Sequence, residues 1–126
     1  MSERGVFARI LHSDPAREYA TEERCHILEL SNTEADEELS VARARVEPGV
    51  TTAWHRVEET AERYVLIEGE GRVEVDGLDA EVVTAGDVVI IPPGLRQRIT
   101  NTGNVDLVFL ALCTPRFRQS RYIHDE

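Results

Sequence analysis

Short apolar runs separated by turn signals fill the chain from residue 49 to residue 113, and no amphipathic helix pattern interrupts them. Asp76-Gly77 is typical of a tight hairpin turn, and Pro92-Pro93-Gly94 ends the β-branched run 88–91. Many short strands without helical crossovers predict an antiparallel sandwich or barrel. Closure into a barrel also removes exposed sheet edges in a chain of this size. The pattern therefore predicts an all-β fold.

The expected strands occupy residues 25–30, 39–46, 64–67, 73–75, 80–84, 88–91, 95–100 and 105–113, with a further short strand at 7–11 and one or two helical turns within 15–23. Within residues 39–46, the apolar residues Ala42, Ala44 and Val46 alternate with Arg43 and Arg45. We therefore expect Arg43 and Arg45 on the outside of the barrel or at a dimer contact. The charged tail, residues 116–126, has only three apolar anchors, which are Phe117, Tyr122 and Ile123.

Composition narrows the class of protein. The 126 residues fit one domain, and 41% of them are hydrophobic, which argues against disorder. A formal net charge of -10 repels phosphate backbones, so we expect no nucleic-acid partner. No apolar run reaches membrane-spanning length and the first residues lack a signal-peptide pattern, so we expect a cytoplasmic protein without a membrane contact. Cys25 and Cys113 are expected to be free thiols.

His55 and Glu62 are the strongest candidates for a polar site. They are seven residues apart, and on one continuous strand an odd separation would place their side chains on opposite faces. The polar residues 58–60 supply a break where the chain can turn. An imidazole and a carboxylate on adjacent strands can then converge on one metal ion.

Two stretches of the chain resemble the motifs of the cupin family. The first motif, G-x5-H-x-H-x(3,4)-E-x6-G, is matched by Gly49, His55, Glu62 and Gly69. The second motif, G-x5-P-x-G-x2-H-x3-N, is matched within GDVVIIPPGLRQRITN by Gly86, Pro92, Gly94 and Asn101. Two independent spacings in the right order make the resemblance specific, and together they cover residues 49–101.

The resemblance implies a double-stranded β-helix, or jelly-roll, cupin barrel that forms a single domain over residues 1–126. Its motif core would be residues 49–101, its N-terminal strands would lie within 5–46, and its C-terminal strand and tail would occupy 105–126. It further implies a homodimer. A pocket at the barrel mouth would take a small-molecule ligand or substrate, and there the family holds a divalent metal with three histidines and one glutamate.

The chain departs from this ligand set at two positions. Val57 stands in the slot of the second histidine, and Gln97 stands in the histidine slot of the second motif. A neutral amide is a poorer donor to a transition metal than imidazole. One interpretation is that His55, Glu62 and Gln97 bind one divalent ion, which could be Mn, Fe, Zn, Ni or Cu. The other is that they form a hydrogen-bonded cluster without metal.

Strand parity suggests which side chains surround this trio. His55 and Val57 share a face, as do Glu62, Tyr64 and Leu66, and as do Gln97 and Ile99. The predicted pocket lining is therefore Trp54, Val57, Tyr64, Leu66, Ile99 and Cys113. Trp54 and Cys113 could also be ordinary core residues, and Tyr64 is a candidate to orient the substrate.

Together these features predict a metal-binding small-molecule cupin that acts as an oxygenase, isomerase or lyase. A non-catalytic, metal-free barrel that binds a small apolar or carbohydrate ligand is the alternative from another class, and a sensory module is a third. The fold alone does not decide the reaction.

Overall fold

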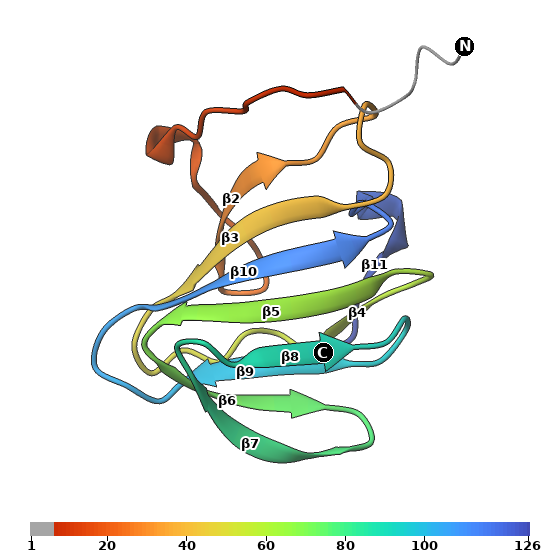
Figure 1. Cartoon of the computed structure of the whole chain (residues 1–126). Helices are drawn as coiled ribbons and strands as arrows, with labels where there is room; N and C mark the ends of the chain where they lie inside the picture. Colours follow the sequence, from red (N-terminus) through yellow and green to blue (C-terminus); the bar gives the residue numbers. More distant parts are fainter. Residues whose placement is uncertain (1–6) are drawn as a thin grey trace.

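The computed structural model describes residues 7–126 and is built almost entirely from antiparallel strands (Figure 1). One sheet has six strands in the order β1-β2-β3-β10-β5-β8, and the other has five in the order β11-β4-β9-β6-β7. The strands are β1 Tyr19–Ala20, β2 His26–Ser31, β3 Ser40–Val46, β4 His55–Val57, β5 Ala61–Glu68, β6 Glu70–Val75, β7 Leu78–Thr84, β8 Val88–Ile91, β9 Gln97–Asn101, β10 Leu107–Thr114 and β11 Tyr122–His124. The predicted all-β jelly roll is confirmed.

Alternating side chains explain how the two sheets enclose one core. Along β5 every second residue, Glu62, Tyr64 and Leu66, is buried, and β9 buries Gln97, Ile99 and Asn101 in the same way. The inward-facing apolar residues of both sheets form one cluster. Its largest fully buried members include Leu66, Ile91, Ile99 and Leu107.

A turn between β4 and β5 sends the chain from one sheet to the other. β4 belongs to the five-stranded sheet and β5 to the six-stranded sheet, and residues 58–59 form the turn that joins them. His55 and Glu62 therefore come from opposite sheets, and both are buried. The change of direction expected from their odd spacing is present.

The N-terminal segment differs from the prediction. Residues 7–11 form no strand, and a short 3-10 helix, η1, spans Pro15–Arg17. The predicted N-terminal region 5–46 begins at two residues that lie outside the described residues; within the rest of it, β1, β2 and β3 are strands. The apolar run at 7–11 fails as a strand because no neighbouring strand pairs with it.

The outer face of β3 carries the two arginines that alternate with its core residues. Arg43 lies 3.3 Å from the Glu18 carboxylate, and Arg45 lies 2.8 Å from Glu18 and 3.1 Å from Asp106. The hydrogen bonds and charge of Arg45 lower the pKa of Glu18 to about 2. The arginines therefore tie the chain after η1 to the outside of the sheet.

Within residues 7–126 no helix is long and apolar enough to span a membrane.

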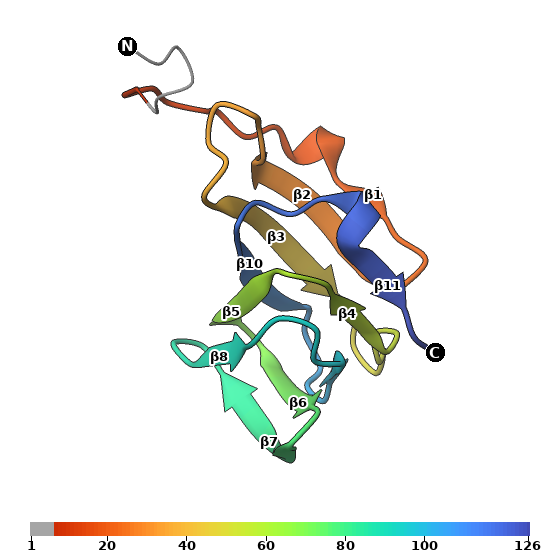
Figure 2. The same cartoon turned by 90° about the vertical axis from the view of Figure 1, so that its right-hand side faces the viewer.

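The C-terminal tail is part of the barrel. A second 3-10 helix, η2, spans Gln119–Arg121, and the strand β11 pairs antiparallel with β4 through Tyr122↔Val57 and His124↔His55. Figure 2 shows β11 beside β4, in the sheet that does not contain β10. The sequence indicated only apolar anchors here, whereas the structure gives the tail a strand that borders His55.

Candidate active site

A cavity of about 220 Å³ opens between the N-terminal strands of the six-stranded sheet and the β4–β11 pair. We call it the pocket. Its wall combines carboxylates, hydroxyls, amides, aromatic rings and small apolar side chains. It is lined by Tyr19, Thr21, Glu22, Glu23, Ile27, Glu29, Asn32, Ser40, Val41, Ala42, His55, Val57, Glu62, Ala111, Cys113, Phe117, Gln119 and Tyr122.

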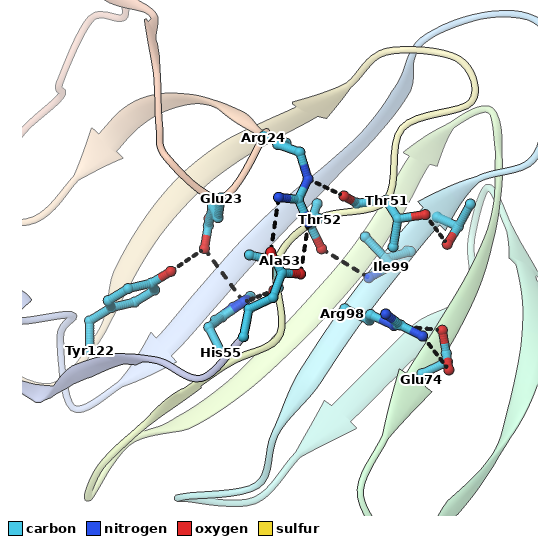
Figure 3. A network of polar contacts seen from close by, with 12 residues as sticks. Glu23, Arg24, Thr51, Thr52, Ala53, His55, Glu74, Arg98, Ile99 and Tyr122 are labelled. Atoms are coloured by element: carbon cyan, nitrogen blue, oxygen red, sulfur yellow. Dashed lines mark hydrogen bonds and ion pairs between the residues drawn. The ribbon is translucent and has the colours of Figure 1, made fainter.

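His55 is held in one orientation on the pocket wall. Its Nδ1 atom lies 2.9 Å from the backbone oxygen of Ala53 and 3.5 Å from a carboxylate oxygen of Glu23 (Figure 3). A carbonyl oxygen can only accept, so Nδ1 carries the proton of a neutral ring. Nε2 is then the nitrogen with a free lone pair. His55 therefore has the tautomer of a general base.

Glu23 and Tyr122 complete the surroundings of His55. The Tyr122 hydroxyl donates a hydrogen bond of 3.0 Å to the same Glu23 oxygen that faces His55. The Tyr122 ring also stacks on the imidazole, with ring centroids 5.5 Å apart. Three segments distant in sequence thus meet here (Figure 3). A carboxylate behind a histidine stabilises the imidazolium that forms when the ring accepts a proton.

Glu62 is the buried carboxyl group of the pocket. The residue is 8% exposed, and its Oε1 atom has no hydrogen-bond partner among the described residues. Burial raises the pKa of Glu62, and the Glu23 charge acts in the same direction, while His55 and Gln97 oppose it. A raised pKa favours the protonated carboxylic acid, which can donate a proton.

Gln97 is engaged on the core side of this cluster. β9 pairs with β4 at His55↔Gln97, so the two side chains come from neighbouring positions. The Tyr64 hydroxyl donates a hydrogen bond to the amide oxygen of Gln97. That oxygen is the atom which a metal would need from Gln97. The amide group therefore serves a buried hydrogen bond with Tyr64.

The predicted pocket residues divide into two groups. His55, Val57, Glu62 and Cys113 line the pocket. Burial raises the pKa of the Cys113 thiol to about 12, so this sulfur stays protonated. Four others lie inside the barrel but off the pocket wall, and all are buried: Tyr64, Leu66, Gln97 and Ile99.

Trp54 differs from the prediction. It is not on the pocket wall, and its ring is covered by the guanidinium groups of Arg96 and Arg98, which lie 4.8 and 4.4 Å from the ring centroid. The reason is parity, because Trp54 directly precedes His55, and neighbouring residues of an extended chain point to opposite faces.

Comparison with known families decides the relationship of the chain. The family model for the cupin domain matches residues 42–113, which is more than half of the 126 residues. The chain belongs to the cupin family. Within it, this cupin is 33% identical over 106 residues to an uncharacterized protein of Methanocaldococcus jannaschii, covering 82% of this chain and 84% of the relative.

A sequence and a crystal structure from Thermotoga maritima are also similar to this cupin. It is 39% identical over 71 residues to an oxalate-binding protein, and this alignment covers 56% of the chain and only 58% of the relative's length. The crystal structure of a predicted oxalate decarboxylase superposes with a TM-score of 0.74 at 27% identity, covering 85% of this chain and 99% of that one. The terms oxalate-binding and oxalate decarboxylase are descriptions of the Thermotoga maritima sequence and structure.

The donor set of this cupin does not fit the family's metal site. Of the four usual ligand positions, two hold Val57 and Gln97, and the amide oxygen of Gln97 already accepts from Tyr64. Among residues 7–126 no three His, Cys, Asp or Glu side chains lie close enough together to hold an ion. One imidazole and one buried carboxyl are too few ligands for a stable transition-metal site.

Glu23 and Tyr122 are the site residues that sequence reasoning missed. Both lie outside the motif core, Glu23 in the loop before β2 and Tyr122 at the start of β11. No spacing in the sequence links either one to His55. The one available signal was Tyr122, an aromatic residue in a charged tail, which indicated an anchor but not its partner.

Proposed function

We propose that this cupin is a metal-independent acid–base enzyme, of the lyase or isomerase kind, acting on a small molecule in the pocket. The observation that carries the proposal is that His55, backed by Glu23, lines the same pocket as Glu62, whose Oε1 atom has no hydrogen-bond partner among the described residues. A base and an acid facing one cavity supply what an elimination or proton shift needs.

The roles follow from the chemistry of each group. His55 Nε2 accepts a proton from a carbon next to a carbonyl group, and Glu23 stabilises the imidazolium that results. Glu62 gives its proton to the departing hydroxyl, which leaves as water while the electron pair of the C–H bond forms the double bond. Tyr122 holds Glu23 in place through its hydroxyl group.

The test is proton exchange at carbon. Chelator-treated protein is incubated in heavy water with a panel of small β-hydroxy carbonyl compounds, and loss of the α-proton signal is followed by NMR. We expect exchange with at least one compound, and a rate lower by about 10² to 10⁴-fold in His55→Gln. Added EDTA should leave the rate unchanged. Activity that requires one equivalent of metal, or equal exchange in His55→Gln, would contradict the proposal.

A second candidate function is non-catalytic binding of a small ligand. The apolar part of the pocket wall, with Val57, Ala111 and Phe117, favours it, as does the similarity to an oxalate-binding protein. We do not extend oxalate itself to this chain, because several carboxylates line the pocket and would repel a dianion. Binding of a panel compound without exchange in the same experiment would favour this candidate.

We also propose that this cupin is a homodimer. In the six-stranded sheet, β5 lies between β10 and β8 (Figure 1). On the outer face of these strands Val65 lies between Val88 and Leu110 in register. Val88 is 54% exposed and Ile90 63% exposed. An apolar face of this kind is typical of a protein interface.

The dimer can be tested with two matched valines. Val88 on this face and Val82 on the other sheet are almost equally exposed, at 54% and 53%. We expect Val88→Glu to raise the dimer dissociation constant at least about tenfold in analytical ultracentrifugation, because a charge would be buried at the interface. Val82→Glu should behave like the unaltered protein. A monomeric unaltered protein, or equal effects of both variants, would argue against this face.

A further inference from the structure

Acidic side chains outnumber basic ones on the pocket wall. Glu22, Glu23 and Glu29 line the pocket, together with Glu62, whose raised pKa favours the neutral acid. Among the described residues, His55 is the only side chain on its wall that can carry a positive charge. Low-dielectric walls focus such a field, so the pocket attracts cations and repels anions.

Two arginines, Arg24 and Arg45, are paired outside the pocket. Arg24 follows Glu23 directly, yet its guanidinium pairs with Glu126 at 2.8 Å and its Nε donates to the backbone oxygen of Thr51 (Figure 3). Arg45 is held by Glu18 and Asp106 on the outer face of β3. The negative charge of the pocket is therefore left for a ligand.

An unsatisfied atom indicates that a ligand belongs here. Glu62 is more than nine-tenths buried, lines the pocket, and has an Oε1 atom without a hydrogen-bond partner. Leaving a buried polar atom unpaired is unfavourable, and a donor group on a ligand would remove that cost. A donor that meets Glu62 would be an N–H or O–H group.

The aromatic rings on the pocket wall favour a donor that is an ammonium group. Tyr19, Phe117 and Tyr122 all line the pocket, and the Phe117 and Tyr122 rings meet edge to face with centroids 6.4 Å apart. The Tyr19 hydroxyl lies 3.5 Å from the carboxylate of Glu29. Aromatic faces beside carboxylates are the surroundings in which proteins bind ammonium groups, through cation–π and ionic attraction together.

We propose that the pocket takes a small organic cation, a molecule with an ammonium group and no acidic group. This deepens the proposed function by naming the substrate class of the same pocket. Carboxylates at the rim, Glu22 and Glu29, would attract the cation, and the aromatic rings would receive its ammonium group.

Three four-carbon probes of equal length test the charge preference: 1,4-diaminobutane, 1,4-butanediol and succinate. Binding is measured by NMR from the ring signals of His55 and Tyr122 in the unaltered protein. We expect the diamine to bind at least about tenfold tighter than the diol and succinate to cause no shift. Diamine affinity should fall when NaCl is raised from about 0.05 to about 0.5 M, because salt screens the attraction.

Variants of the two rim glutamates test whether these side chains attract the diamine. In the double variant Glu22→Gln with Glu29→Gln we expect diamine affinity to fall roughly fivefold to 20-fold, as for two partly exposed ion pairs. Glu81→Gln, at an exposed position of the edge strand β7, should leave diamine affinity unchanged. Succinate binding, equal affinity for diol and diamine, or no diamine binding overturns the proposal. These are equilibrium measurements, so they can fail while the acid–base proposal stands, and the reverse also holds.

Discussion

Replacing Gly69 with alanine is expected to lower the free energy of unfolding by about 2–4 kcal/mol. Gly69 joins β5 to β6 with a φ of +87°, which side chains rarely adopt. A Cβ atom there would lie 2.7 Å from the backbone oxygen of Asp106 and 3.0 Å from the Cα of Leu107. Backbone atoms cannot rotate away, so the β5–β6 connection must shift. This close approach accounts for the glycine that ends the first cupin motif.

Gly77 is the matched control for this change. Its φ is +82°, almost the same as that of Gly69, but apart from its chain neighbours no described residue has an atom within 4 Å of the position where a Cβ would stand. Gly77→Ala should therefore show only the cost of the backbone conformation, about 1 kcal/mol. Urea unfolding of both variants measures the difference. Equal losses would mean that the approach of Asp106 to Gly69 does not matter.

The second large effect concerns Glu62 and pH. Because burial raises the pKa of Glu62 in the folded protein, the folded state keeps its proton where the unfolded chain, with an ordinary pKa near 4.5, has lost it. The unfolded state then binds fewer protons, so stability falls as pH rises. The contribution of the neutral carboxyl is fully present below about pH 4.5 and is lost as pH rises through the raised pKa.

Glu62→Gln removes this titration and keeps the shape. We expect the variant to match the unaltered protein at about pH 4 and to exceed its stability by about 1–3 kcal/mol at about pH 8, because an amide carries no buried charge. Denaturant melts across the pH range measure the difference. Glu81→Gln, the same change on an exposed strand, should show no such trend. Parallel pH profiles for Glu62→Gln and the unaltered protein would refute a perturbed carboxyl.

Much of the framework could be predicted from residue patterns. The alternation in 39–46 identified the inner and outer faces of β3, and the odd spacing of His55 and Glu62 required the turn that the structure contains. Strand parity correctly predicted that Gln97 and Ile99 share one face of β9, and that face is buried. These inferences succeed because the period of two along a strand is a local property of the backbone.

The surroundings of His55 could not be predicted in this way. Glu23 reaches His55 from the loop before β2. Tyr122 reaches it because β11 pairs with β4, which brings together Tyr122 and Val57, 65 residues apart in the sequence. Such a contact depends on tertiary closure of the barrel. Likewise, no pattern in the sequence indicated that the amide oxygen of Gln97 accepts a hydrogen bond from Tyr64.

The protonation of Glu62 tests the account most directly. A carboxylate bound to a metal is ionised, whereas an acid that donates a proton must hold one, so a single titration separates the two. Protein labelled with ¹³C in its glutamate carboxyl groups is titrated by NMR, with Glu62→Gln assigning the signal. We predict a midpoint above the ordinary value of 4.5 that neither EDTA nor added Zn²⁺ changes. A midpoint at or below that value, or one that rises when EDTA is added, would contradict a metal-independent acid at this site.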